Sequence, residues 1–171
     1  MLIGFTGSQS GMTQFQKDES RKILIEKECS ELVFGDCIGS DLQVATIALT
    51  VGVRIFTIHP PDNPNKRAWA WDQDKTTKNN RIITPYINKI GISVRWYPVC
   101  NYLKRNHHIV DQVALLIATP KEFQHTLRSG TWSTIRYAWK TKKNIIIIPP
   151  VDRPIEANSS ETELTEESKG E

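Results

Sequence analysis

The stretch HTLRSGTWSTIRYAWKTKKNIIII, from His125 to Ile148, predicts a turn, a helix and a strand in immediate succession. The helix is expected from Thr131 to Thr141, and the four isoleucines that follow form an apolar run typical of a buried strand. Small polar residues precede the helix, whose first backbone N–H groups have no partner within the helix. Such a helix start is a natural binding site for an anion.

Strands and helices alternate in the same way along the rest of the chain. The apolar runs predict strands at residues 2–6, 31–35, 53–59, 113–119 and 144–149, and helices at about 13–29, 39–52, 102–112 and 131–141. Strands that are apolar throughout are buried on both faces, as in parallel sheets covered by helices. We therefore expect an α/β fold: a Rossmann-like, doubly wound parallel sheet of about five strands, with helices on both faces.

Two helix boundaries carry specific signals. Thr13 and Gln16 have the spacing of a capping box at the start of the first helix. Gly52 is expected to end the second helix, because glycine readily adopts the left-handed conformation that is common just after a helix.

With 171 residues, the chain is long enough for one domain with a proper core. We expect this domain to cover residues 1–152, with an insertion near residues 60–93 that acts as a lid or a subunit contact. The insertion is rich in proline, asparagine and lysine, and its two tryptophans, Trp69 and Trp71, argue against a simple linker. Residues 153–171 are polar and acidic, and we expect them to form a disordered tail.

The composition, with 39% hydrophobic and 24% charged residues, is that of an ordinary globular protein. No apolar run approaches the roughly 20 residues that span a bilayer, and the N-terminus has no secretion signal. Cys29, Cys37 and Cys100 have no metal-ligand spacing, and their odd number argues against a disulfide framework. We expect a cytoplasmic protein with no metal site and no membrane partner.

The formal net charge of +3 conceals an uneven distribution. From Ile155 onward the chain carries six glutamates and one lysine, a charge of −5, so the preceding residues carry +8. A charge of this sign favours an anionic partner such as a nucleotide, a phosphate or a nucleic acid. A solvated basic surface without a partner explains the same charge equally well.

Three of the predicted strands are followed by glycine and hydroxyl residues at the start of a helix. The loops are TGSQSGMT after the first strand, GDCIGSD after the second, and the segment containing RSGT after the fourth. Loops at the carboxyl ends of parallel strands meet at one edge of the sheet, where ligands bind. None of the three is a P-loop or a regular G-x-G-x-x-G dinucleotide motif.

A set of segments resembles, in content and order, the SLOG superfamily: GFTGSQSGMT, FGDCIGSDLQVATIA, IHPP, YLKRNHHIVDQVALLIATP and LRSGTWSTIRYAWK. This group of Rossmann-like domains includes the LOG-type cytokinin-activating enzymes, once called lysine-decarboxylase-like, and DNA-processing protein A. The resemblance covers nearly all of residues 2–149, apart from most of the insertion. It implies a nucleotide or nucleotide-derived ligand, held mainly by the loops after the first, second and fourth strands.

LOG enzymes carry a G-G-x-G-T-x-x-E motif in which the Gly-Thr pair binds phosphate and the glutamate works in N-glycosidic cleavage. Gly130 and Thr131 match the Gly-Thr pair, but Thr134 stands at the glutamate position, and Leu127 and Arg128 replace the double glycine. Without that carboxylate, no obvious group stabilises an oxocarbenium-like sugar or activates water. The resemblance therefore favours binding without turnover, with no catalytic residue assigned; Asp36 and Asp41 are the alternative carboxylates that could substitute for the glutamate.

Several side chains in the predicted site have two alternative roles. Asp36 can accept hydrogen bonds from ribose hydroxyls or cap a turn, and Asp41 is more typical of a first-turn acid. Arg105 can bind a phosphate in a bidentate manner or lie on the surface as an ordinary arginine. His59 is the best histidine candidate for ligand contact. The candidate ligand-binding residues are Gly7, Ser8, Gly35, Asp36, Gly39, Ser40, Asp41, His59, Arg105, Asn106, Arg128, Ser129, Gly130 and Thr131.

The leading hypothesis is a protein that binds a nucleotide or an NAD-derived signal, as a sensor or a sequestering protein. One version is a phage protein that traps a host immune nucleotide. The first alternative is a LOG-like nucleoside-monophosphate phosphoribohydrolase. The second is a single-stranded DNA-binding module, motivated by the basic segments NKRAW and LKRNHH. Nucleic acid ranks last, so the expected partner is a phosphate-bearing nucleotide or an ADP-ribose-type ligand, with no further cofactor.

Self-association is also expected. Trp132 and Trp139 are seven residues apart and share one face of their helix. Together with the tryptophans of the insertion, they give more aromatic surface than the core of one small sheet needs. We expect a homodimer or a higher homo-oligomer.

Overall fold

The computed structural model describes residues 1–68 and 91–151. The predicted acidic tail and most of the predicted insertion, including Trp69 and Trp71, lie outside the described residues.

Six strands form one sheet in the order β4-β3-β2-β1-β5-β6, and every neighbouring pair is parallel. The strands are β1 (Leu2–Gly7), β2 (Glu31–Phe34), β3 (Ile55–Ile58), β4 (Ser93–Trp96), β5 (Leu115–Thr119) and β6 (Asn144–Ile147). The chain builds the sheet outward from β1 to β4 and then returns to add β5 on the other side of β1. The order of the strands therefore reverses between β1 and β5.

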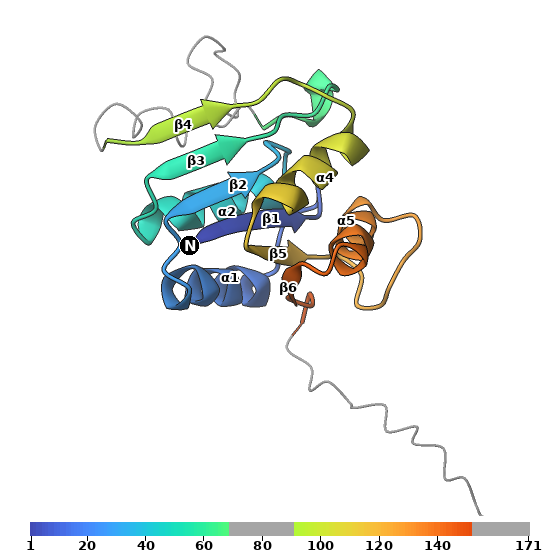
Figure 1. Cartoon of the computed structure of the whole chain (residues 1–171). Coiled ribbons are helices and arrows are strands. Elements are labelled where there is room, and N and C mark those ends of the chain that lie inside the picture. The colour runs from blue at the N-terminus through green and yellow to red at the C-terminus, as the bar shows by residue number, and fades with distance from the viewer. Residues whose placement is uncertain (69–90, 152–171) are drawn as a thin grey trace, which may run out of the picture.

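Helices cover both faces of this sheet, as the sequence predicts. They are α1 (Gln14–Glu26), α2 (Ser40–Thr50), α4 (Tyr102–Gln112) and α5 (Gly130–Lys140), with a short 3₁₀ helix, η1, at Pro64–Lys66. Figure 1 shows α2 behind the sheet and α4 in front of it. α1 packs against α2, and α4 packs against α5. The doubly wound α/β prediction is confirmed.

The strands are apolar throughout because both of their faces are buried. Val33 and Phe34 are neighbours in β2, so their side chains point to opposite faces of the sheet, and both are fully buried. Phe34 packs in the core cluster that includes α1 and α2, where its ring meets Phe56 edge to face. Val33 packs in the cluster that contains Ile109 and Val110 of α4.

The predicted signals at two helix ends are present. Thr13 and Gln16 form a full capping box at the start of α1. The amide of Gln16 also donates to the carbonyl oxygens of Pro120 and Ile148, each at 2.9 Å, which ties α1 to the ends of β5 and β6. Gly52 follows α2 with a φ of +97°, which lies in the left-handed region.

The prediction of about five strands was one too low, because β4 was missed. β4 is only four residues long, lies at the edge of the sheet and has mostly exposed side chains. An edge strand of this kind shows no continuous apolar run, so the predicted insertion ended near residue 93 and no strand was assigned to residues 94–96. Its parallel pairing with β3 extends the sheet instead.

Within the described ranges, no helix has the length and apolar composition needed to cross a membrane.

Gly7 ends β1 where the strand passes close to its neighbours. A Cβ atom at this position would lie 2.4 Å from Cβ of Ser40 and 2.4 Å from Oγ1 of Thr119. We expect Gly7→Ala to lower the free energy of unfolding by about 1–3 kcal/mol through overpacking, measured by urea denaturation.

The matched control is Gly130→Ala. A Cβ atom at Gly130 has only Cε2 of Tyr102 near it, at 3.9 Å. We expect its effect to stay within about 0.5 kcal/mol. Equal stability of Gly7→Ala and the wild type would contradict the close approach of β1 to α2 and β5.

Candidate functional site

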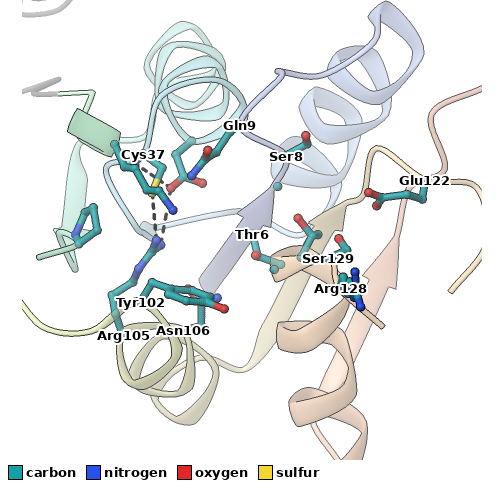
Figure 2. A pocket seen from close by; sticks show the side chains of 16 residues that line it. Thr6, Ser8, Gln9, Cys37, Tyr102, Arg105, Asn106, Glu122, Arg128 and Ser129 are labelled. Atoms are coloured by element: carbon teal, nitrogen blue, oxygen red, sulfur yellow. Dashed lines mark hydrogen bonds and ion pairs between the residues drawn. The ribbon is translucent and has the colours of Figure 1, made fainter. Parts of the chain in front are cut away.

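A pocket of about 370 Å³ lies at the carboxyl edge of the sheet, where the strand order reverses between β1 and β5. This is the place where open α/β sheets bind ligands. The pocket is lined by Thr6, Gly7, Ser8, Gln9, Cys37, Asp41, Pro61, Lys66, Tyr102, Arg105, Asn106, Glu122, Arg128, Ser129, Gly130 and Thr131. Figure 2 shows their side chains converging from the end of β1, the start of α4 and the loop between β5 and α5.

The loop after β1 is held against the start of α2. The backbone N–H and the hydroxyl of Ser40 both donate to the carbonyl oxygen of Ser8, at 3.0 and 2.8 Å. Gly39 has a φ of +87°, and a Cβ atom there would lie 2.3 Å from the carbonyl oxygen of Gln9. Gly39 and Ser40 therefore support the pocket from behind and do not line it.

A buried ion pair forms one wall of the pocket. Nη1 of Arg105 lies 3.8 Å from Oδ2 of Asp41, and Nη2 donates to Sγ of Cys37 at 3.0 Å. Asp41 also accepts a bond from the backbone N–H of Cys37 at 3.0 Å. Nε of Arg105 has no hydrogen-bond partner among the described residues, although the residue is only 7% exposed. One donor of a buried guanidinium thus has no protein partner within the described residues.

Burial and charge in this cluster raise the pKa values of two side chains, Asp41 and Cys37. Burial raises the pKa of Asp41 to about 6, and the positive charge of Arg105 opposes that rise. Burial and the Asp41 charge raise the pKa of the Cys37 thiol to about 12. At neutral pH Cys37 is a protonated thiol, so it is not a ready nucleophile.

Gly35 explains how Arg105 reaches this position. A Cβ atom at Gly35 would lie 1.5 Å from Nη1 of Arg105. The guanidinium therefore occupies the space beside the backbone of residue 35, and Gly35 acts on the site through Arg105.

The start of α5 forms the opposite wall. The hydroxyl of Ser129 caps the helix by accepting from the backbone N–H of Trp132 at 3.4 Å. The next two backbone N–H groups, those of Gly130 and Thr131, have no partner within the helix. Thr131 is buried, and Gly130 has open space on the side where a side chain would project.

The position of the LOG glutamate lies behind this wall. Thr134 is fully buried, accepts a hydrogen bond from the amide of Asn106 at 2.7 Å and donates to the carbonyl oxygen of Gly130 at 3.1 Å. Thr134 therefore joins α4 to α5 and does not line the pocket. Asn106, which does line it, is held in place by this bond.

Two further predicted residues, Asp36 and His59, lie outside the pocket lining. Asp36 has a φ of +54°, and its buried carboxylate pairs with Arg67 at 3.1 Å. His59 is buried, stacks on the ring of Tyr97 at 4.1 Å between centroids and bonds to the Gln112 amide.

The structure thus divides the predicted residues into two groups. Those that line the pocket are Gly7, Ser8, Asp41, Arg105, Asn106, Arg128, Ser129, Gly130 and Thr131. Those outside the lining are Gly35, Asp36, Gly39, Ser40 and His59.

Sequence reasoning missed several lining residues, among them Pro61, Lys66, Tyr102 and Glu122. Tyr102 had a usable signal, because it lies three and four residues before Arg105 and Asn106 and so shares their helix face. Lys66 lies in the short 3₁₀ helix η1 and Glu122 in a loop, where spacing in the sequence does not predict which side chains meet.

The lining carries three cationic side chains, those of Lys66, Arg105 and Arg128, and two carboxylates, those of Asp41 and Glu122. Asp41 already lies against Arg105. No group of three or more metal-ligating side chains is present in the described parts of the chain. The arrangement offers backbone N–H groups, hydroxyls and cations to an anionic ligand.

His59 gives a prediction for the pH dependence of stability. Burial, and then the nearby charges of His108 and Arg105, lower the pKa of His59 to about 4. The unfolded chain gains a proton at His59 near pH 6.5, whereas the folded chain gains it only near pH 4. The contribution of neutral His59 to stability is complete above pH 6.5 and is lost as the pH falls toward 4.

Between pH 7 and pH 4.5 the unfolding free energy of the wild type should fall by about 1–3 kcal/mol more than that of His59→Gln. Urea denaturation at both pH values measures the difference. The control His125→Gln replaces an exposed histidine and should keep the wild-type pH dependence. Identical pH profiles for wild type and His59→Gln would contradict a depressed His59 pKa.

Comparisons with known proteins bear on the fold. No protein-family model matches the chain, and no curated protein matches it. Solved structures that are similar include TM1055, at 13% identity and a TM-score of 0.53, with 84% of this chain and 71% of that chain covered. A molybdenum cofactor binding protein from Rippkaea orientalis has 16% identity and a TM-score of 0.52, with 86% and 76% covered.

DNA processing protein A from Streptococcus pneumoniae has 18% identity and a TM-score of 0.58, with 88% of this chain covered. The chain spans 50% of that longer protein. At such identities a structural match establishes the fold. The chain therefore shares the Rossmann-like α/β fold of these three proteins.

Proposed function

We propose that the pocket binds the phosphate of a nucleotide or an ADP-ribose-type ligand. The observation that carries this proposal is the meeting of two anion-binding features in one pocket. The N-terminus of α5 and the buried guanidinium of Arg105, with its unpartnered Nε, both line it. A helix N-terminus offers N–H groups and a positive dipole end to an anion, and a guanidinium adds a charge-assisted hydrogen bond.

The remainder of the pocket suits the rest of a nucleotide. Its volume of about 370 Å³ lies at the lower end of the range of small-molecule sites. Tyr102 and Pro61 supply apolar surface that part of the ligand can cover. Nζ of Lys66 lies 5.8 Å from the centroid of the Tyr102 ring, which places a further cation beside that surface.

We favour binding, as a sensor or a sequestering protein, over hydrolysis. The side chain of Thr134, at the position of the LOG glutamate, is buried behind the pocket in bonds to Asn106 and Gly130. After incubation of the protein with AMP or ADP-ribose, chromatography should show the ligand intact. Release of a free base would overturn the binding-only proposal in favour of a phosphoribohydrolase.

The single-stranded DNA alternative has its own signature. Fluorescence anisotropy measures the binding of a labelled single-stranded oligonucleotide. An affinity that falls steeply as the salt concentration rises would support this alternative. Mononucleotide binding that resists moderate salt supports the pocket proposal instead.

The start of α5 gives the central test. We expect Gly130→Val to remove most of the affinity for AMP or ADP-ribose, because its side chain projects into open space where a phosphate would lie. Thr131→Ala should cost about 1 kcal/mol, roughly a fivefold loss, the scale of one hydrogen bond. Both changes are measured by isothermal titration calorimetry.

Ser133→Ala, on the same helix but outside the pocket lining, is the matched control and should bind like the wild type. Circular dichroism and urea denaturation establish that each variant folds. Wild-type affinity in a folded Gly130→Val protein would place the site elsewhere.

We also propose that the chain self-associates. Trp132 is buried, whereas Trp139 is 49% exposed, and the loop before α5 exposes Phe123 and Leu127. Contiguous exposed apolar surface commonly marks an interface, and we propose that Trp139 contributes to one.

Light scattering should give a mass of at least twice 19.5 kDa at micromolar concentration. Trp139→Lys, which places a charge in this surface, should shift the mass toward that of one chain. A wild-type mass of one chain would refute the proposal.

A further inference from the structure

Glu122 lines the pocket, and one oxygen of its carboxylate has no hydrogen-bond partner among the described residues. It belongs to the loop between β5 and α5, and its Oε2 is buried without a hydrogen bond among the described residues. Figure 2 shows Glu122 across the pocket from Arg105, with Ser129 between them. Leaving a buried polar oxygen unpaired costs about 1–3 kcal/mol, and more for a charged group.

A carboxylate accepts hydrogen bonds and repels anions, so the ligand group that faces Glu122 must donate hydrogen bonds. Hydroxyl and amino groups are the donors that a nucleotide carries. Whether a hydroxyl or an amino group faces Glu122 depends on how far each lies from the phosphate along the nucleotide. Glu122 and Ser129 lie on the same wall, so a phosphate at the start of α5 places its attached sugar nearest to Glu122, with the base farther away.

We propose that Glu122 accepts hydrogen bonds from the vicinal hydroxyls of a ribose, and that the pocket thereby selects ribonucleotides over nucleotides that lack these hydroxyls. This inference rests on the proposed phosphate site at the start of α5. A vicinal diol presents two O–H donors to the two oxygens of one carboxylate. A sugar without them leaves Oε2 buried and unpaired, and the affinity falls accordingly.

The test compares nucleotides that differ only in the sugar. AMP and GMP are titrated against their 2′,3′-dideoxy forms by calorimetry, for the wild type and for Glu122→Gln. The wild type should bind each ribonucleotide at least about tenfold more tightly than its dideoxy form. In Glu122→Gln the ratio should fall below about threefold, mainly through weaker binding of the ribonucleotide.

Thermal stability separates this role from a structural one. An unpartnered buried carboxylate does not stabilise the fold, so Glu122→Gln should keep or raise the Tm of the unliganded protein. Glu26→Gln, which replaces an exposed glutamate at the end of α1, is the control for the loss of one negative charge and should change neither the Tm nor the sugar ratio.

The outcomes distinguish this inference from the proposed function. Equal affinity for ribo and dideoxy forms, with binding still lost in Gly130→Val, would overturn the role of Glu122 and leave the phosphate site standing. A sugar ratio unchanged in Glu122→Gln, or a Tm several degrees lower, would also overturn it. No binding of any of these nucleotides to the wild type would overturn both.

Discussion

Arg105 carries a positive charge into the protein interior, and much of the carboxyl edge of the sheet is arranged around it. Removing a guanidinium from water costs several kcal/mol unless partners compensate. The partners are Asp41 at the start of α2 and Cys37 in the loop before it. Because Arg105 belongs to α4, this cluster links helices on opposite faces of the sheet. The pocket wall therefore has a fixed charge in a fixed place before any ligand arrives.

This arrangement accounts for an acid beside a proposed phosphate site. Burial alone would favour a neutral Asp41, and Arg105 opposes that tendency. An anion placed near Arg105 would compete with Asp41 for the guanidinium and favour protonation of Asp41. Glu122 differs, because no cationic side chain within the described residues forms an ion pair with it. The two carboxylates of the pocket thus have different environments and are suited to different tasks.

Much of the fold was predictable from the sequence because strands that are buried on both faces have continuous apolar runs. β1 and β5 read as unbroken apolar runs, and the Thr13–Gln16 capping box fixed the start of α1. β4 has no such apolar run, since an edge strand buries little of its surface. The same reasoning applies to the site. Ser129, Gly130 and Thr131 were found because helix starts have a local signature. Lys66, in a short 3₁₀ helix, and Glu122, in a loop, reach the pocket only through tertiary packing.

The contact between Gly35 and Arg105 has a consequence for how this fold can vary among relatives. The two residues share one volume, since a Cβ atom at position 35 would lie 1.5 Å from Nη1 of Arg105. A chain with a larger residue at the first position can keep its fold only with a shorter side chain at the second. The two positions should therefore covary, and a relative that has lost the glycine should also have lost the buried cation and, with it, this means of holding an anion.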